Sequence, residues 1–153
     1  MSTRTAIASL VLAASTLVGI AVHEGYSSTP IVPIPGDVLT IGFGETKGVK
    51  ASDRTTPTRA LVTLLGSVGE YEAAVKRCAP VPMHTYEYAA YVSVTYNIGQ
   101  GAFCSSKMAK KLKALDYAGA CAEILRWDRA QGRVVRGLTV RRQAEYQQCM
   151  GPA

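Results

Sequence analysis

Apolar and polar positions divide the chain into an uncharged segment, an irregular segment and a helical remainder. No charged side chain occurs in residues 5–22, TAIASLVLAASTLVGIAV. From residue 55 onwards, apolar side chains recur at intervals of three and four, which is the spacing of an amphipathic α-helix. Thr56 can cap the first of these helices, and Pro57 suits its first turn. Its apolar face is expected to hold Ala60, Leu61, Leu64, Leu65, Val68, Tyr71 and Val75.

Prolines and glycines mark where elements end in the rest of the chain. Pro80 and Pro82 end the first helix. The remaining helices are expected from near His84 to the Asn97-Ile98-Gly99 turn, from Ser105 or Ser106 through Leu112, from Asp116 through Trp127, and over residues 138–149. Within the Pro/Gly-rich residues 25–50, VLTIGFG alternates apolar and small residues as a short strand does, with turns at 36–37 and 42–44. The pattern predicts an α+β fold, mostly helical, with a small antiparallel β-sheet near the N-terminus.

The uncharged segment has the length of a membrane span but a weak apolar character. As a helix, residues 5–22 would be about 27 Å long, close to a bilayer core of about 30 Å. Arg4 at its edge would retain that end in the cytoplasm. Ten of the eighteen residues are Ala, Ser, Thr or Gly, so insertion is marginal. A cleaved signal peptide and a permanent anchor are alternatives, but we favour a segment that enters the membrane for export and later leaves it to pack as the first helix.

Charge is distributed unevenly along the chain. The net charge is +6, and all of the excess lies in residues 105–153, which hold ten Lys or Arg against four Asp or Glu. A basic lobe favours an anionic polymer or an anionic membrane surface as partner, although a solvated face without a partner has the same composition. No basic run interleaves with aromatic residues, so a nucleic-acid partner is not expected. The length of 153 residues suits one domain.

The cysteines indicate disulfides rather than a metal site. Only four are present, Cys78, Cys104, Cys121 and Cys149. They form no CxxC pair and the two histidines lie elsewhere in the chain, so a zinc site is not expected, and no other metal or cofactor is expected either. Two bridges are expected if the chain is exported, and buried thiols if it stays in the cytosol. Of the three possible pairings, Cys78–Cys104 and Cys121–Cys149 is favoured because each bridge closes a short loop.

Two carboxylates and a threonine are candidates for catalysis. Glu24 directly follows the apolar segment, and packing of that helix would desolvate the carboxyl group and raise its pKa. A protonated acid can donate a proton to a leaving-group oxygen, so Glu24 is a candidate general acid. The alternative is that Glu24 is an ordinary surface glutamate. Asp37 lies across the Pro-rich loop, where it can also serve as a turn former, and Thr40 follows in the expected strand. Together the three could bracket a glycosidic bond.

Several motifs carry a family resemblance over roughly residues 18–150. HEG followed by LTIGFGET, then YNIGQGAF, KMAKKLKALDYAGACAEILRW and GRVVRGLTVRRQAE, resemble the phage lysozymes of the T4-type family, glycoside hydrolase family 24. The weakly apolar N-terminus is similar to that of the signal-anchor-release endolysins. The resemblance implies a lysozyme-like fold with two lobes joined by a long helix. It also implies a segment 1–22 that becomes the first helix and a catalytic domain at 23–153.

The resemblance also implies roles for individual residues. Glu24 matches the general acid, and Thr40 matches the threonine that helps to hold the attacking water. The position expected for the second acid falls on Pro33 or Ile34, so Asp37 is assigned as the only carboxylate in the loop. Glu45 stays open as an alternative, because the family often has Gly-His-Thr where this chain has Gly44-Glu45-Thr46.

Lesser roles concern the C-terminal half of the chain. Tyr96 and Asn97 are expected to face the cleft, although they equally suit a helix end. Arg141 or Arg142 is expected to pair with a cleft carboxylate, with a surface position on the last helix as the alternative. Trp127 is expected in the core rather than as a sugar platform.

The resemblance implies a monomeric peptidoglycan muramidase, or endolysin, for host lysis. Its partners would be the glycan strands and, through residues 5–22, the inner membrane of a Gram-negative host before release to the periplasm. A non-catalytic wall-binding protein and a lytic transglycosylase are the alternatives.

Overall fold

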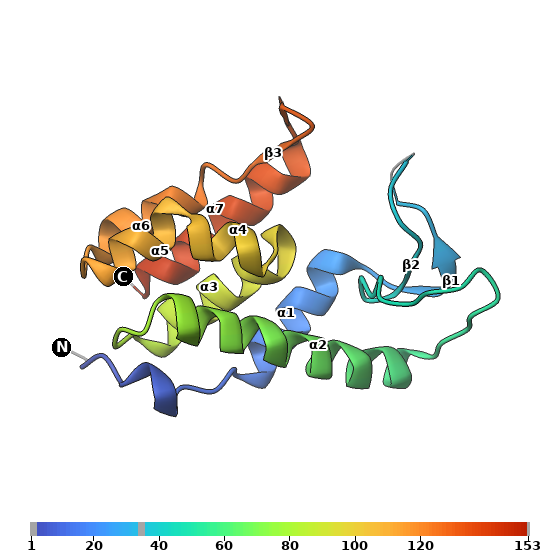
Figure 1. The fold of residues 1–153 in the computed structure, drawn as a ribbon, viewed down its shortest axis with the longest axis horizontal. Coiled ribbons are helices and arrows are strands. Elements are labelled where there is room, and N and C mark those ends of the chain that lie inside the picture. Colours follow the sequence, from blue (N-terminus) through green and yellow to red (C-terminus); the bar gives the residue numbers. More distant parts are fainter. Residues whose placement is uncertain (1–2, 34–35, 153) are drawn as a thin grey trace. The chain divides into compact units, whose positions relative to one another are not determined.

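The computed structural model describes residues 3–33 and 36–152, and the chain forms two compact units (Figure 1). Unit 1 consists of Met1–Ala13 together with Glu70–Ala153, and unit 2 is Ala14–Gly69. The division at residue 69 falls inside helix α2 (Pro57–Cys78), so one long helix contributes to both units. The mostly helical α+β prediction, with a long helix shared by two lobes, is confirmed.

Unit 2 combines one helix, a small sheet and the first part of α2. Helix α1 (Ala14–Glu24) is followed by strands β1 (Ser27–Ile31) and β2 (Thr40–Gly42). The strands are antiparallel, with an irregularity between the two aligned pairs. Ile41 and Glu45 then exchange backbone hydrogen bonds of 2.9 and 3.0 Å, which closes a tight turn directly after β2. The predicted sheet is therefore confirmed, and its second strand ends in the glycine turn.

Helix α2 begins as the sequence predicts. The Thr56 hydroxyl accepts a hydrogen bond from the amide of Arg59 at 3.3 Å, which satisfies one of the helix's free N-terminal donors. Its buried face includes Ala60, Leu64, Val68 and Val75 at spacings of four and seven, whereas Leu61 and Leu65 are exposed. The helix ends at Cys78, before the predicted proline pair.

Helix α3 (Thr85–Ile98) forms the buried centre of its part of unit 1. Residues 87–95 of α3 are all buried, and α3 packs against α7. The other elements are α4 (Gln100–Ser105), α5 (Lys107–Lys113), α6 (Tyr117–Ile124), β3 (Arg129–Ala130), β4 (Arg133–Val134) and α7 (Arg136–Met150). The predicted helix from Asp116 stops at Ile124 instead of Trp127, because a β3–β4 hairpin follows. Gln131 and Gly132 at its tip both have positive φ, as a two-residue hairpin turn requires.

Both expected disulfides form, and both lie in unit 1. Cys78 at the end of α2 bonds to Cys104 in α4, and Cys121 in α6 bonds to Cys149 in α7. The bridges span 26 and 28 residues, and closure of loops of that length is worth roughly 3–4 kcal/mol each in the chain-entropy model. The pairing predicted from loop length is therefore confirmed.

The uncharged segment is divided between the two units rather than forming one helix over 5–22. Residues 7–9 form a 3-10 turn, and α1 begins only at Ala14. Between them, the Lys76 Nζ donates to the Leu10 carbonyl at 2.7 Å, and the Leu12 amide donates to the Glu72 carboxylate at 3.1 Å. The Leu10 carbonyl and the Leu12 amide therefore bond to side chains of α2 instead of to the backbone of a continuous helix. Among the described residues, the structure contains no helix both long and apolar enough to cross a membrane.

Candidate active site

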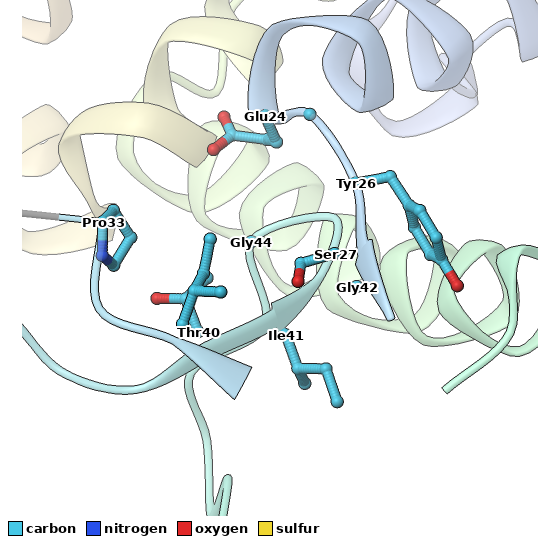
Figure 2. Close-up of a pocket in the computed structure, with 10 residues that line it drawn as sticks. Glu24, Tyr26, Ser27, Pro33, Thr40, Ile41, Gly42 and Gly44 are labelled. Atoms are coloured by element: carbon cyan, nitrogen blue, oxygen red, sulfur yellow. The ribbon is translucent and has the colours of Figure 1, made fainter. Parts of the chain in front are cut away.

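A pocket of about 240 Å³ lies in unit 2, between the end of α1, the two strands and the glycine turn (Figure 2). Glu24, Thr40 and Gly44 all line it. Figure 2 shows Glu24 extending from the end of α1 and Thr40 directed from β2 toward the same space. Two of the three predicted catalytic side chains therefore share one pocket.

The end of α1 places Glu24. Gly25 has a φ of +71°, and its amide donates to the Ala21 carbonyl at 3.1 Å, so the helix is closed by a left-handed glycine. Ile20 and Ala21 in the same turn are buried, which fixes the rotation of the helix. Glu24 itself is half-buried at the last helical position. The sequence signal for this geometry is the Glu-Gly pair after an apolar run.

The glycine turn packs against the Glu24 side chain. A Cβ atom on Gly44 would lie 3.2 Å from the Glu24 Oε2 and 3.5 Å from its Cγ. Gly44 also has a φ of +90°, a conformation that side chains of L-residues rarely adopt. Gly44 thus provides the space in which the carboxylate rests, a role that the sequence analysis did not assign.

Glu45 lies in the same turn but makes structural contacts. Its Oε1 accepts a hydrogen bond from the Lys47 amide at 2.7 Å, and its Oε2 accepts one from the Ser67 hydroxyl at 3.0 Å. The bond with Lys47 closes the turn after β2, and the bond with Ser67 ties that turn to helix α2. Glu45 does not belong to the pocket lining.

Asp37 is exposed, and it is not among the residues that line the pocket. Its Oδ1 accepts a hydrogen bond from the amide of Val38 at 2.8 Å, and the Thr40 hydroxyl donates to the Val38 carbonyl at 3.3 Å. Of the two positions at which the family pattern expects the second acid, Pro33 lines the pocket and Ile34 lies outside the described residues. The structure therefore brings Glu24 and Thr40 together and places Asp37 on the loop that leads into β2.

The four predicted binding residues lie in unit 1, where three of them form a network between α3 and α7. Arg142 is fully buried, its Nη2 donates to the Asn97 Oδ1 at 2.9 Å, and its Nε lies 2.9 Å from the Glu145 Oε2. The Arg141 Nε lies 3.2 Å from the Glu145 Oε1. Both arginines therefore pair with a carboxylate of their own helix. Spacings of three and four to Glu145 could have indicated this.

Tyr96 and Trp127, two aromatic residues of unit 1, lie in different surroundings. The Tyr96 ring packs against Tyr71, with ring centroids 4.9 Å apart. Trp127 is half-buried and lines a shallow pocket of about 300 Å³ together with Lys107, Glu123 and Arg126.

No group of three or more His, Cys, Asp or Glu residues suited to a metal ion occurs within residues 3–33 and 36–152.

Alanine at Gly44 should displace the Glu24 carboxylate and lower kcat by about 10²-fold, the effect expected of a misplacement of about 1 Å. Gly48→Ala is the matched control, because Gly48 also has a positive φ, +67°, but nothing lies within 4 Å of its Cβ position. Initial rates of the reaction that Glu24 is predicted to catalyse, and melting temperatures, would be measured for both variants. Equal loss of activity in the two variants would show that backbone strain, and not contact with Glu24, is responsible.

A carboxylate at a helix end, opening onto a pocket beside a small antiparallel sheet, in a chain whose other unit is mostly helical, defines a lysozyme-like glycoside hydrolase. The sequence model of the family described as phage lysozyme matches residues 21–145. The chain belongs to the phage lysozyme family.

Individual relatives agree with this assignment. An endolysin of Acyrthosiphon pisum secondary endosymbiont phage 1 is 36% identical over 110 residues, which are 69% of this chain and 75% of the relative. The SAR-endolysin of Pseudomonas phage phiKMV is 30% identical over 145 residues, 92% of this chain and 89% of the relative. Among solved structures, the endolysin from Escherichia coli O157:H7 phage FAHEc1 is similar with a TM-score of 0.83 at 28% identity, over 94% of this chain and 95% of that one. The protein is a lysozyme, a glycoside hydrolase with peptidoglycan as its substrate.

Proposed function

We propose that Glu24 is the general acid of an endolysin that hydrolyses the β-1,4 bond between N-acetylmuramic acid and N-acetylglucosamine. The observation that carries this proposal is the Glu24 carboxylate in one pocket with Thr40, held against Gly44. Membership of the phage lysozyme family and similarity to proteins named endolysin support muramidase activity in host lysis.

Hydrolysis by a single displacement, the route proposed here, requires one proton donor and one activated water. The protonated Glu24 carboxyl gives its proton to the glycosidic oxygen as the C1–O bond breaks. Water adds to C1 and loses a proton to the second carboxylate, while the Thr40 hydroxyl holds that water in place. Asp37 is proposed as this carboxylate, because it is exposed on the loop before β2, whereas both oxygens of Glu45 accept structural hydrogen bonds. Tyr96, Asn97, Arg141 and Arg142 are proposed to support substrate binding, with the arginines acting through the packing of α3 and α7.

Mass analysis of the products from purified peptidoglycan tests the reaction. Hydrolysis gives fragments that end in reducing N-acetylmuramic acid, each carrying one added water. Anhydro ends, lighter by that water, would identify a lytic transglycosylase instead. A wall-binding protein without activity would sediment with peptidoglycan and release no fragments.

Two variants test whether Asp37 or Glu45 is the second carboxylate. Asp37→Asn is expected to lower kcat by about 10²-fold, the smaller end of what acid–base catalysis contributes. Glu45→Gln should retain activity within a few-fold, because its amide oxygen can still accept from Ser67. The measurement is kcat and KM on solubilised glycan strands. The reverse order of effects would transfer the role to Glu45.

Membrane tethering is the second part of the proposal. We propose that residues 5–22 hold the newly made chain at the inner membrane of a Gram-negative host, with Arg4 in the cytoplasm, and that the protein is then released to the periplasm as a monomer with an intact N-terminus. The lack of charge in this segment and similarity to a protein named SAR-endolysin support it. Fractionation before and after depolarisation should show the full-length chain moving from membrane to periplasm, and a shortened product would indicate signal cleavage instead.

A further inference from the structure

The N-terminal residues make a specific contact with unit 1 through Arg4. The Arg4 Nη2 donates to the Glu87 Oε1 at 2.7 Å, and the Arg4 Nε donates to the Glu87 Oε2 at 3.1 Å. The Arg4 guanidinium carbon also lies 3.6 Å from the centre of the Tyr117 ring. The side chain of Glu87 is only 4% exposed, so the carboxylate is shielded from water on its other sides. A two-pronged ion pair stacked on an aromatic ring is a geometry that Arg forms and Lys does not.

The site that receives Arg4 is held in place by other residues of unit 1. The His84 amide donates to the Glu87 Oε2 at 2.8 Å, which fixes the carboxylate at the start of α3. The Tyr117 hydroxyl donates to the Pro82 carbonyl at 2.8 Å, which fixes the ring. Neither contact involves the N-terminal residues. The carboxylate and the ring therefore have supports independent of Arg4.

The residues after Arg4 continue along the same surface. Thr5 and Met83 exchange two backbone hydrogen bonds of 2.9 Å each. Ile7 and Leu10 are buried. At the far end, Glu72 accepts from the Leu12 amide and from the Tyr88 hydroxyl, at 3.1 and 2.8 Å. Residues 3–13 thus form a docked segment, fixed by polar contacts at both ends with apolar contacts between them.

The Arg4–Glu87 contact is incompatible with the tethered state proposed above, on which this inference rests. If residues 5–22 lie in the membrane with Arg4 on the cytoplasmic side, Glu87 lies on the other side with the rest of the chain. The two groups can meet only after Arg4 has crossed. We propose that residues 3–13 form a release latch: Arg4 first retains the N-terminus in the cytoplasm, and after release the same side chain closes on Glu87 and Tyr117 and keeps the segment out of the membrane.

Arg4→Lys separates the two roles of Arg4. Lysine keeps the positive charge that retains the N-terminus, but it lacks the fork and the flat face that the latch uses. Hydrogen exchange of the Thr5 and Met83 amides in the released, full-length protein should be about tenfold faster or more in Arg4→Lys than in wild type. Amides of α7 should exchange at the same rate in both proteins. Arg54→Lys is the matched control, because Arg54 lies on the exposed surface of unit 2 and donates to the carbonyl of the adjacent Asp53.

A vesicle experiment tests the consequence for the membrane. Purified full-length protein would be mixed with vesicles of phosphatidylethanolamine and phosphatidylglycerol and then sedimented. Wild type and Arg54→Lys should stay in the supernatant, and several-fold more Arg4→Lys should sediment with the lipid. Equal exchange at Thr5 and Met83 in wild type and Arg4→Lys would overturn the latch. Wild-type protein in the soluble fraction of energised cells would instead overturn the membrane stage, whatever the exchange rates.

Discussion

Glu24→Gln should abolish lysis and lower kcat on purified peptidoglycan by about 10³-fold, within the range that general acid–base catalysis contributes. The amide has nearly the same shape as the acid, so contact with Gly44 and the closing of α1 by Gly25 are retained. It cannot, however, release a proton to the glycosidic oxygen. Clearing of peptidoglycan in a gel and initial rates of reducing-end release would both measure the loss.

Further measurements test whether the loss of activity comes from the missing proton donor rather than from changes in folding or binding. The melting temperature of Glu24→Gln and its sedimentation with peptidoglycan should equal those of wild type, because only the reacting group has changed. Glu24→Asp keeps the acid but withdraws it by about one methylene, and a misplacement of about 1 Å is expected to cost about 10²-fold. Clearing that survives in Glu24→Gln would remove Glu24 from the mechanism, whatever the family assignment.

The starts of two helices could be predicted from the sequence alone, because each helix begins at a residue whose side chain caps it. Thr56 before Pro57 set the start of α2, and Asp116, whose Oδ1 accepts from the Gly119 amide at 2.9 Å, set the start of α6. These contacts span three residues, so the sequence contains both partners. The β3–β4 hairpin was missed, because Gln131-Gly132 is not among the usual turn dipeptides and strands of two residues carry no alternation to detect.

Contacts between distant residues explain what the sequence could not show. Residues 5–22 read as one helix, but Lys76 bonds to the Leu10 backbone across 66 residues and Glu72 bonds to the Leu12 backbone across 60. Similarly, only the structure shows that the backbone of Gly44 meets the Glu24 side chain. The sequence indicated which residues belong to the site. The distances between those residues depend on the turn after β2, which Ser67 fixes through its hydrogen bond to Glu45.

The largest expected loss of stability comes from Glu145. This side chain is 2% exposed and lies between two buried guanidinium groups, those of Arg141 and Arg142. The Ser93 hydroxyl also donates to its Oε1 at 2.7 Å, so one carboxylate joins α3 to α7. Glu145→Gln removes the carboxylate charge that faces both of these buried guanidinium groups. Removal of one partner from a buried ion pair typically costs about 3–5 kcal/mol.

Urea unfolding at neutral pH would measure this cost directly. For a chain of this length each kcal/mol lowers the melting temperature by about 2–4 °C, so Glu145→Gln should melt about 10 °C below wild type. Glu123→Gln is the matched control, because Glu123 also pairs with two cations, Lys111 at 3.0 Å and Arg126 at 3.7 Å, whose side chains are 36% and 66% exposed. Exposed pairs contribute at most about 1 kcal/mol, so this variant should stay close to wild type. Equal losses in the two variants would mean that water reaches the Glu145 network, and that the contact between α3 and α7 depends on apolar packing rather than on paired charges.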